Sequence, residues 1–140
     1  MSMPTSISLL GVILATISSF IVGSIWYSPS VFLKPWMKMV GANDAHMKKT
    51  FGKSMVYIAV ASLLTAYVLA IFTNYTAEVT GVSHLMAGLE TALWLWVGVA
   101  ATTIVANGSL DTRDPMLMII QAGNRLITLV VMGVVIGLFR

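Results

Sequence analysis

The two side chains best placed to do chemistry are an acid and a base that interrupt long apolar runs. Glu90 lies in the run from 84 to 106, and Arg125 lies in the run from 116 to 139. Ionisable residues inside a membrane segment are costly unless they are paired, so they mark candidate functional sites. With a rise of about 1.5 Å per residue, their backbones differ in depth by roughly 10 Å. Two long side chains can bridge much of that gap, so a Glu90–Arg125 pair is one hypothesis.

Arg125 belongs to a polar stripe on one face of its predicted helix, with members at i, i+3, i+4 and i+7. The members are Gln121, Asn124, Arg125 and Thr128. On the preceding run, Trp94 shares a face with Glu90 and is placed to stack on a guanidinium. The pattern predicts a polar core around these residues. Three interpretations stay open: a clasp that fixes helix register, a path for a solute, ion or proton, and a contact with a subunit or lipid headgroup.

Small residues recur at four-residue spacing in three of the apolar runs. They are Gly11, Ala15, Ser19 and Gly23 in the first, Ser62, Ala66 and Ala70 in the second, and Gly133 and Gly137 in the fourth. Such stripes let helix backbones approach closely in lipid. They predict packing within the bundle, with a subunit interface on one stripe as the alternative.

Residues that usually carry catalysis or metal binding are sparse. The chain has no cysteine, and neither His46 nor His84 has a second ligand at metal-site spacing. Because no strand is expected, no glycine-rich phosphate loop of the strand-to-helix kind is expected either. The sequence therefore predicts no catalytic set, no metal and no cofactor, and a non-enzymatic role.

The elements that position these residues are predicted from composition and run length. Of 140 residues, 58% are hydrophobic and 9% are charged, whereas an average soluble domain is about 25% charged. A crossing takes about 20 apolar residues, and no run alternates with period two. We expect an all-α, polytopic membrane protein with one four-helix transmembrane domain spanning about 7–27, 54–73, 84–106 and 116–139.

The loops predict orientation. Basic residues gather between the first two spans, at Lys34, Lys38, Lys48, Lys49 and Lys53, with Arg113 in the third loop. Residues 1–6 and the second loop, 74–83, have none. Cytoplasmic loops are rich in Lys and Arg, so we expect a multi-pass plasma-membrane protein with the lysine-rich loop inside and both termini outside. The net charge of +3 then reflects topology, and nucleic acid is not an expected partner.

The first loop has a pattern of its own. Lys34 and Lys38 lie four apart among apolar residues, which suits a short helix in the headgroup plane with its lysines toward anionic lipid. An irregular loop is the alternative. The Asn43-Asp44 pair predicts another short turn leading to Lys53, and residues 114–115 (Asp-Pro) predict the start of the fourth helix.

A glycine–tryptophan–tyrosine–proline elbow carries a family resemblance. Its residues are Gly23, Trp26, Tyr27 and Pro29, followed by Phe32 and Trp36. With 121–124 (Gln-Ala-Gly-Asn) and 132–133 (Met-Gly), it resembles small bacterial four-helix integral membrane proteins catalogued as a domain of unknown function. The resemblance implies the four-helix fold and no reaction. That family more often carries an aromatic residue or histidine near 124–125, so Arg125 departs from it.

The aromatic residues of the elbow also have a direct physical interpretation. Trp26 and Tyr27 anchor the helix end, Pro29 stops the helix, and Phe32 with Trp36 hold the next segment at the interface. The leading functional hypothesis is assembly, as a homo-oligomer or as an accessory subunit of a membrane complex. A small channel or transporter with a polar core around Glu90 and Arg125 is the alternative. An enzyme acting on lipid or quinone comes last.

Overall fold

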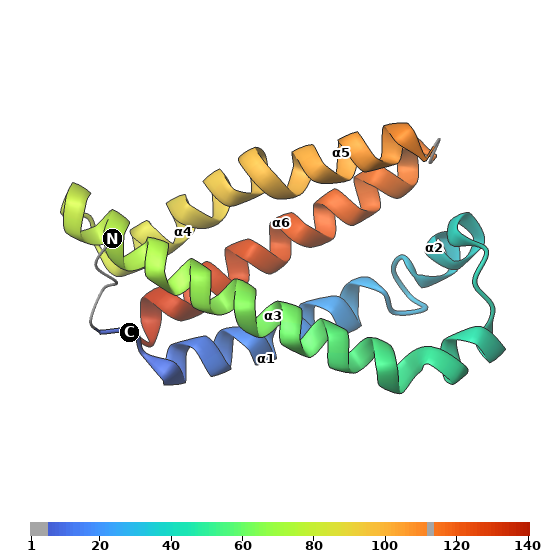
Figure 1. Ribbon diagram of the computed structural model, residues 1–140, viewed down its shortest axis with the longest axis horizontal. Coiled ribbons are helices and arrows are strands. Elements are labelled where there is room, and N and C mark those ends of the chain that lie inside the picture. The colour runs from blue at the N-terminus through green and yellow to red at the C-terminus, as the bar shows by residue number, and fades with distance from the viewer. Residues whose placement is uncertain (1–5, 112–113) are drawn as a thin grey trace.

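A computed structural model describes residues 6–111 and 114–140 of the chain, and every regular element in them is helical (Figure 1). The elements are α1 (Leu9–Trp26), α2 (Leu33–Val40), α3 (Asp44–Thr80), α4 (His84–Leu95), the π-helical turn η1 (Trp96–Ala100), α5 (Ala101–Leu110) and α6 (Pro115–Leu138). The predicted all-α class is thereby confirmed. The basic residue predicted for the third loop, Arg113, and the segment 1–5 lie outside the described residues.

Four helices are long and apolar enough to cross a membrane. They are Leu9–Trp26, Asp44–Thr80, the continuous α4–η1–α5 rod His84–Leu110, and Pro115–Leu138. The four predicted spans each fall mainly within one of these helices. The short helix expected between the first two spans is also present, as α2.

Most helix ends follow from local sequence. Ser8 begins α1 by accepting a hydrogen bond from the Gly11 amide, and Ser83 begins α4 by accepting one from Met86. Asp114 caps α6 in the same way, with proline at the first helical position, as predicted. Two glycines with positive φ, Gly41 and Gly81, end α2 and α3.

The second crossing helix is much longer than its predicted span. Asn43 caps a single helix of 37 residues, so the separate short turn expected before Lys53 is not formed. At its other end the helix continues to Thr80. The prediction of a loop from 74 to 83 was therefore wrong for residues 74–80. The apolar run ends at residue 73, but no proline or glycine follows until Gly81, and polar residues alone do not end a helix.

The helices pack closely at the end that carries the start of α1 and the end of α6 (Figure 1). There α6 contacts α1, α3 and α4, and the buried residues of α3 all lie between Ala66 and Ala77. We call this part the terminal half. Polar contacts join its segments: the Ser8 hydroxyl donates to the Phe139 carbonyl at 2.7 Å, and the Asn74 amide donates to the Ser6 carbonyl at 3.0 Å.

The other part of the bundle, which includes α2, is the elbow half. Toward it the α5–α6 hairpin and the first half of α3 point in different directions, with α2 at that end (Figure 1). No residue of α2 is buried, and none of α3 before Ala66. The hydrophobic core of the described residues therefore belongs mainly to the terminal half.

Candidate functional site

The two ionisable residues predicted to pair lie apart. Arg125 is exposed on α6, Glu90 is half-buried on α4, and no ion pair joins them in the described part of the chain. Glu90 lies on the side of α4 away from the buried residues Gly88 and Ala92, and near Trp94, which is 75% exposed. The described part of this single chain does not enclose the two charges in a common core, and the wider set of polar-core residues stays a prediction.

Helix geometry explains the separation of Glu90 and Arg125. Side chains on a helix lean toward its N-terminus. The N-terminus of α4 is in the terminal half, whereas that of α6 is in the elbow half, because Gly88 of α4 contacts Gly133 of α6 and His84 contacts Gly137. The carboxyl and the guanidinium therefore lean in opposite directions along the bundle. The two charged groups are thus further apart in depth than the backbones that carry them.

The polar stripe on α6 is only partly enclosed by the bundle. Thr128 is buried, Gln121 and Asn124 are half-buried, and Arg125 is exposed. The Asn124 side-chain nitrogen is buried and has no hydrogen-bond partner. The structure thus brings the four predicted residues onto one helix surface without enclosing them.

The elbow between α1 and α2 packs against that same part of α6. The indole N–H of Trp26 donates to the Ile120 carbonyl at 3.1 Å. Gly123 makes this approach possible, because a Cβ there would lie 3.0 Å from the Trp26 ring. The predicted aromatic anchors thereby gain a defined protein partner, which run lengths alone did not indicate.

Ring contacts hold the elbow in shape. Trp26 packs on Phe32 with centroids 4.8 Å apart, and Tyr27 packs on Trp36 at 5.6 Å. The Phe32 amide also donates to the Trp26 carbonyl at 3.1 Å, which closes the turn, and Pro29 is exposed within it. The elbow residues singled out from sequence are therefore one contiguous unit.

Tyr27 connects this elbow to Arg125. Burial raises the pKa of the Tyr27 hydroxyl above its usual value of 10.0, and the positive charge of Arg125 works in the opposite direction. The contacts of Trp26 with Ile120 and Gly123 bring the end of α1 close to the level of Arg125 on α6. The charge of Arg125 therefore acts on the beginning of the elbow.

A second tryptophan contact on α6 was not predicted. The indole N–H of Trp96 donates to the Ala122 carbonyl at 2.8 Å. Trp96 begins the π-helical turn η1, a kind of bulge that often occurs near functional positions. The spacing of Trp96 in the sequence gives no signal for this bond or for the bulge.

The small-residue stripes face the interior of the bundle. Gly11, Ala15 and Ser19 are buried on α1, as are Ala66 and Ala70 on α3 and Gly133 on α6. Gly23 is half-buried, and a Cβ there would meet nothing within 4 Å. Packing within the chain therefore accounts for most of the stripe residues.

The closest approach of backbones involves a glycine that sequence analysis passed over. A Cβ on Gly88 would overlap the Gly133 carbonyl oxygen, and a Cβ on Gly133 would overlap the Gly88 carbonyl oxygen. At Gly137 a Cβ would lie 2.6 Å from the His84 carbonyl oxygen. The four-residue spacing of Gly88 and Ala92 is the signal that could have identified this contact.

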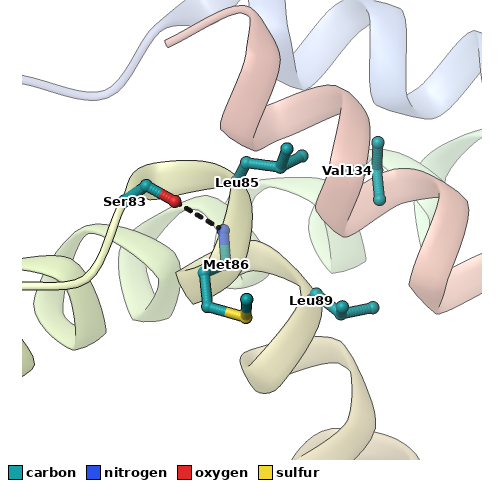
Figure 2. Close-up of a pocket in the computed structure, with 5 residues that line it drawn as sticks. All are labelled: Ser83, Leu85, Met86, Leu89 and Val134. Atoms are coloured by element: carbon teal, nitrogen blue, oxygen red, sulfur yellow. Dashed lines mark hydrogen bonds between the residues drawn. The ribbon is translucent and has the colours of Figure 1, made fainter.

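One surface hollow lies in the terminal half, where α4 meets α6. Figure 2 shows its lining residues: Ser83, Leu85, Met86, Leu89 and Val134. The hydroxyl of Ser83 already accepts a hydrogen bond from the Met86 amide at 3.2 Å, as the cap of α4. The remaining lining is apolar, so the hollow offers contact area and no reactive group.

The two histidines lie at the starts of two different helices, α3 and α4. His46 is exposed at the start of α3, and the Nδ1 atom of His84 is 3.4 Å from a guanidinium nitrogen of Arg140. Within residues 6–111 and 114–140, no three His, Cys, Asp or Glu side chains are placed to hold a metal ion.

Comparison with known proteins gives one match. No curated protein and no solved structure matches the chain. A family model described as "Protein of unknown function (DUF1761)" matches residues 10–137, which include all four long helices, the elbow and the Arg125 region. The chain is therefore a member of the DUF1761 family.

Proposed function

We propose that this chain is a non-enzymatic membrane protein that acts by assembly, either with copies of itself or as a subunit of a larger membrane complex. The supporting observation is that Glu90, an ionisable residue of a helix apolar enough to span, is half-buried on α4 and makes no ion pair with any described residue. Glu90 lies six residues after His84, the first residue of α4, at a distance of about 9 Å along the helix.

Lipid tails offer a carboxyl group no hydrogen-bond partner, whereas a neighbouring helix can. Trp94, one turn further along α4, adds a large ring that is 75% exposed. Aromatic residues are enriched where proteins meet. We call the surface formed by Met86, Glu90 and Trp94 the α4 face. It combines contact area with a group that requires a polar partner.

The alternative of a channel or transporter has less support. It requires Glu90 and Arg125 to share a polar core, and these residues lean toward opposite ends of the bundle.

Assembly is tested by the mass of the protein in mild detergent and in nanodiscs. We expect a mass of more than one copy, or co-purification of a defined partner, and a shift toward the single chain on Glu90→Gln. Exposed Glu78, in the last turn of α3, provides a matched control as Glu78→Gln. A strictly monomeric protein that retains no partner would contradict the proposal.

Cysteine crosslinking identifies the surface used. Because the chain has no cysteine, Trp94→Cys introduces a single thiol on the α4 face. In a homo-oligomer built through that face, oxidation should link two copies. Leu64→Cys, on an exposed position of α3, should link none, and equal linking of both variants would argue against a specific face.

The proposed orientation places the lysine-rich end, with α2 and the start of α3, in the cytoplasm of a bacterium. The start of α1 and the end of α6 lie together at the opposite end of the bundle (Figure 1). A membrane-impermeant thiol reagent applied to whole cells should label Ser6→Cys and not Lys48→Cys. The reverse labelling pattern would overturn the orientation.

A further inference from the structure

We infer that the inner end of the elbow is a binding site for the phosphate of an anionic phospholipid, formed by Arg125 and Tyr27 with the lysines of α2. This inference does not depend on the proposed assembly, because it uses α1, α2 and α6 and not the α4 face. The inner end of the elbow, and of α1, is the place next to α2 where α1 ends and the elbow begins.

The first step is the depth of Arg125. Gly11 of α1 lies beside Phe139, and Trp26 lies beside Ile120 and Gly123. The two helices are therefore antiparallel, and α1 ends opposite the 120–123 segment of α6. Arg125 is near the middle of α6 along the chain, yet it lies only about half a turn from the level at which α1 ends.

The second step relates that level to the membrane. With 18 residues, α1 is about 27 Å long, close to the roughly 30 Å of a hydrocarbon core. If the start of α1 lies at one boundary of the hydrocarbon core, its inner end lies near the other, while the longer α6 continues past that level. Because α6 has its N-terminus on this side, the Arg125 side chain leans toward the boundary, where the headgroups begin.

The third step is the chemistry gathered at this level. The guanidinium of Arg125 is exposed, acts near the Tyr27 hydroxyl, and makes no ion pair with any described residue. Guanidinium groups bind phosphate oxygens through paired hydrogen bonds, and a phenol hydroxyl can donate a third. An arginine that leans out of the hydrocarbon reaches the depth of the lipid phosphates, which attract its charge.

The fourth step is the contribution of α2. Its Trp36 ring packs on Tyr27 at 5.6 Å, which holds α2 beside the same place. Lys34 and Lys38 are both exposed, one turn apart, whereas Leu33, Trp36 and Met37 are half-buried. This division suits a helix that lies at the surface with its ammonium groups among headgroups. Headgroup phosphate, and not free phosphate, is the ligand we assign, because the apolar side of α2 and the elbow rings favour a lipid tail.

The test measures lipid retention by the full chain. Protein purified from vesicles of phosphatidylcholine with a minority of phosphatidylglycerol is examined by native mass spectrometry, and the retained lipids are counted. Each basic residue near the surface contributes about a fivefold preference for anionic lipid. We expect Arg125→Gln to lower the retained phosphatidylglycerol about fivefold, and Lys34→Gln with Lys38→Gln to lower it at least as much.

A matched control distinguishes a site from general surface charge. Lys48 and Lys49, exposed at the start of α3, are changed together to Gln, and retention should stay at the wild-type level. Equal loss in this control, or unchanged retention in Arg125→Gln, would overturn the inference. Displacement of phosphatidylglycerol by inorganic phosphate would also overturn it, because the ligand would then be free phosphate.

The test still gives an answer if one variant fails to fold. Circular dichroism and thermal unfolding check each variant, and Arg125→Lys keeps the charge if Arg125→Gln does not fold. Retention by Arg125→Lys should exceed that of the α2 double variant. If the α2 variant, which removes no buried side chain, retains as much phosphatidylglycerol as the wild type, the inference fails whatever Arg125→Gln does.

Discussion

The terminal half and the elbow half of the bundle are held together by different chemistry. In the terminal half, glycines let two helix backbones touch, and Ala15, Ala66 and Leu69 are fully buried. In the elbow half, indole N–H groups of Trp26 and Trp96 bond carbonyls of α6, while the start of α3 has no buried residue. Close packing thus defines one half, and a few directional contacts define the other.

The exposure of the polar side chains of α6 changes along the helix. Thr128 is in the closely packed half and is buried, whereas Arg125, near the elbow, is exposed. Leu117 and Ile120, closer to the start of α6, are buried again. Arg125 is therefore a locally exposed position between two buried segments of the helix.

The largest expected difference between the halves concerns leucines of α3. Leu69 is fully buried and Leu64 is 61% exposed. Leu69→Ala should lower the free energy of unfolding by about 2–5 kcal/mol, because it leaves a cavity. Leu64→Ala should change it by less than about 0.5 kcal/mol. Thermal and denaturant unfolding in detergent measure both, and similar losses would mean that α3 is equally enclosed along its length.

Glycine-to-alanine substitutions should change stability in opposite directions in the two halves. Gly88→Ala places a methyl group against the Gly133 carbonyl and should destabilise the protein by about 1–3 kcal/mol. Gly52, in the first turns of α3, has nothing within 4 Å of an added Cβ. Gly52→Ala should stabilise the helix by up to about 1 kcal/mol. Unfolding midpoints that move in the same direction would contradict this contrast.

The directional contacts of the elbow can be tested with two tryptophans. Trp26→Phe removes the N–H that bonds the Ile120 carbonyl and should lower the free energy of unfolding by about 1 kcal/mol. Trp36 makes a ring contact with Tyr27, and its N–H has no partner among the described residues. Trp36→Phe should therefore cost less. An equal cost would show that ring area, and not the hydrogen bond, holds the elbow.

The smallest expected effect is a pH dependence from Tyr27. Its pKa is raised above 10.0 by burial, so the folded state prefers the neutral phenol. That contribution to stability is complete below about pH 10 and is lost as the pH rises through the higher folded value. Tyr27→Phe should lose less stability than the wild type in this alkaline range.

Arg125→Gln extends the same test. Removing the positive charge takes away the influence that lowers the pKa of Tyr27. The tyrosinate absorbance assigned to Tyr27, by difference from Tyr27→Phe, should then appear at higher pH. An unchanged titration would show that the guanidinium is not beside the hydroxyl.

Much of the fold could be predicted from sequence because it depends on local patterns. Apolar run length located the four long helices, the Asp-Pro pair located the start of α6, and lysine spacing located α2. The length of α3 could not be predicted from its apolar run, because the helix continues past the end of that run. The stop signal was Gly81, which lies eight residues after Thr73.

The candidate site could be predicted only in part. Sequence spacing correctly placed Gln121, Asn124, Arg125 and Thr128 on one helix surface, and it identified the elbow residues. It could not show which neighbour each helix meets, so Glu90 and Arg125 were joined in a core that does not form. The bond from Trp96 to Ala122 also depends on the π-helical turn, which no pattern indicated.

The central claim is that the bundle keeps its two intramembrane charges on separate surfaces, and a double-mutant cycle tests it most directly. Glu90→Gln and Arg125→Gln are made singly and together, and the free energy of unfolding is measured in nanodiscs. The account predicts that the two effects add within about 0.5 kcal/mol, as for residues that share no partner. A coupling of about 1 kcal/mol or more, with the double variant partly restored, would show that the two charges pair and would contradict the account.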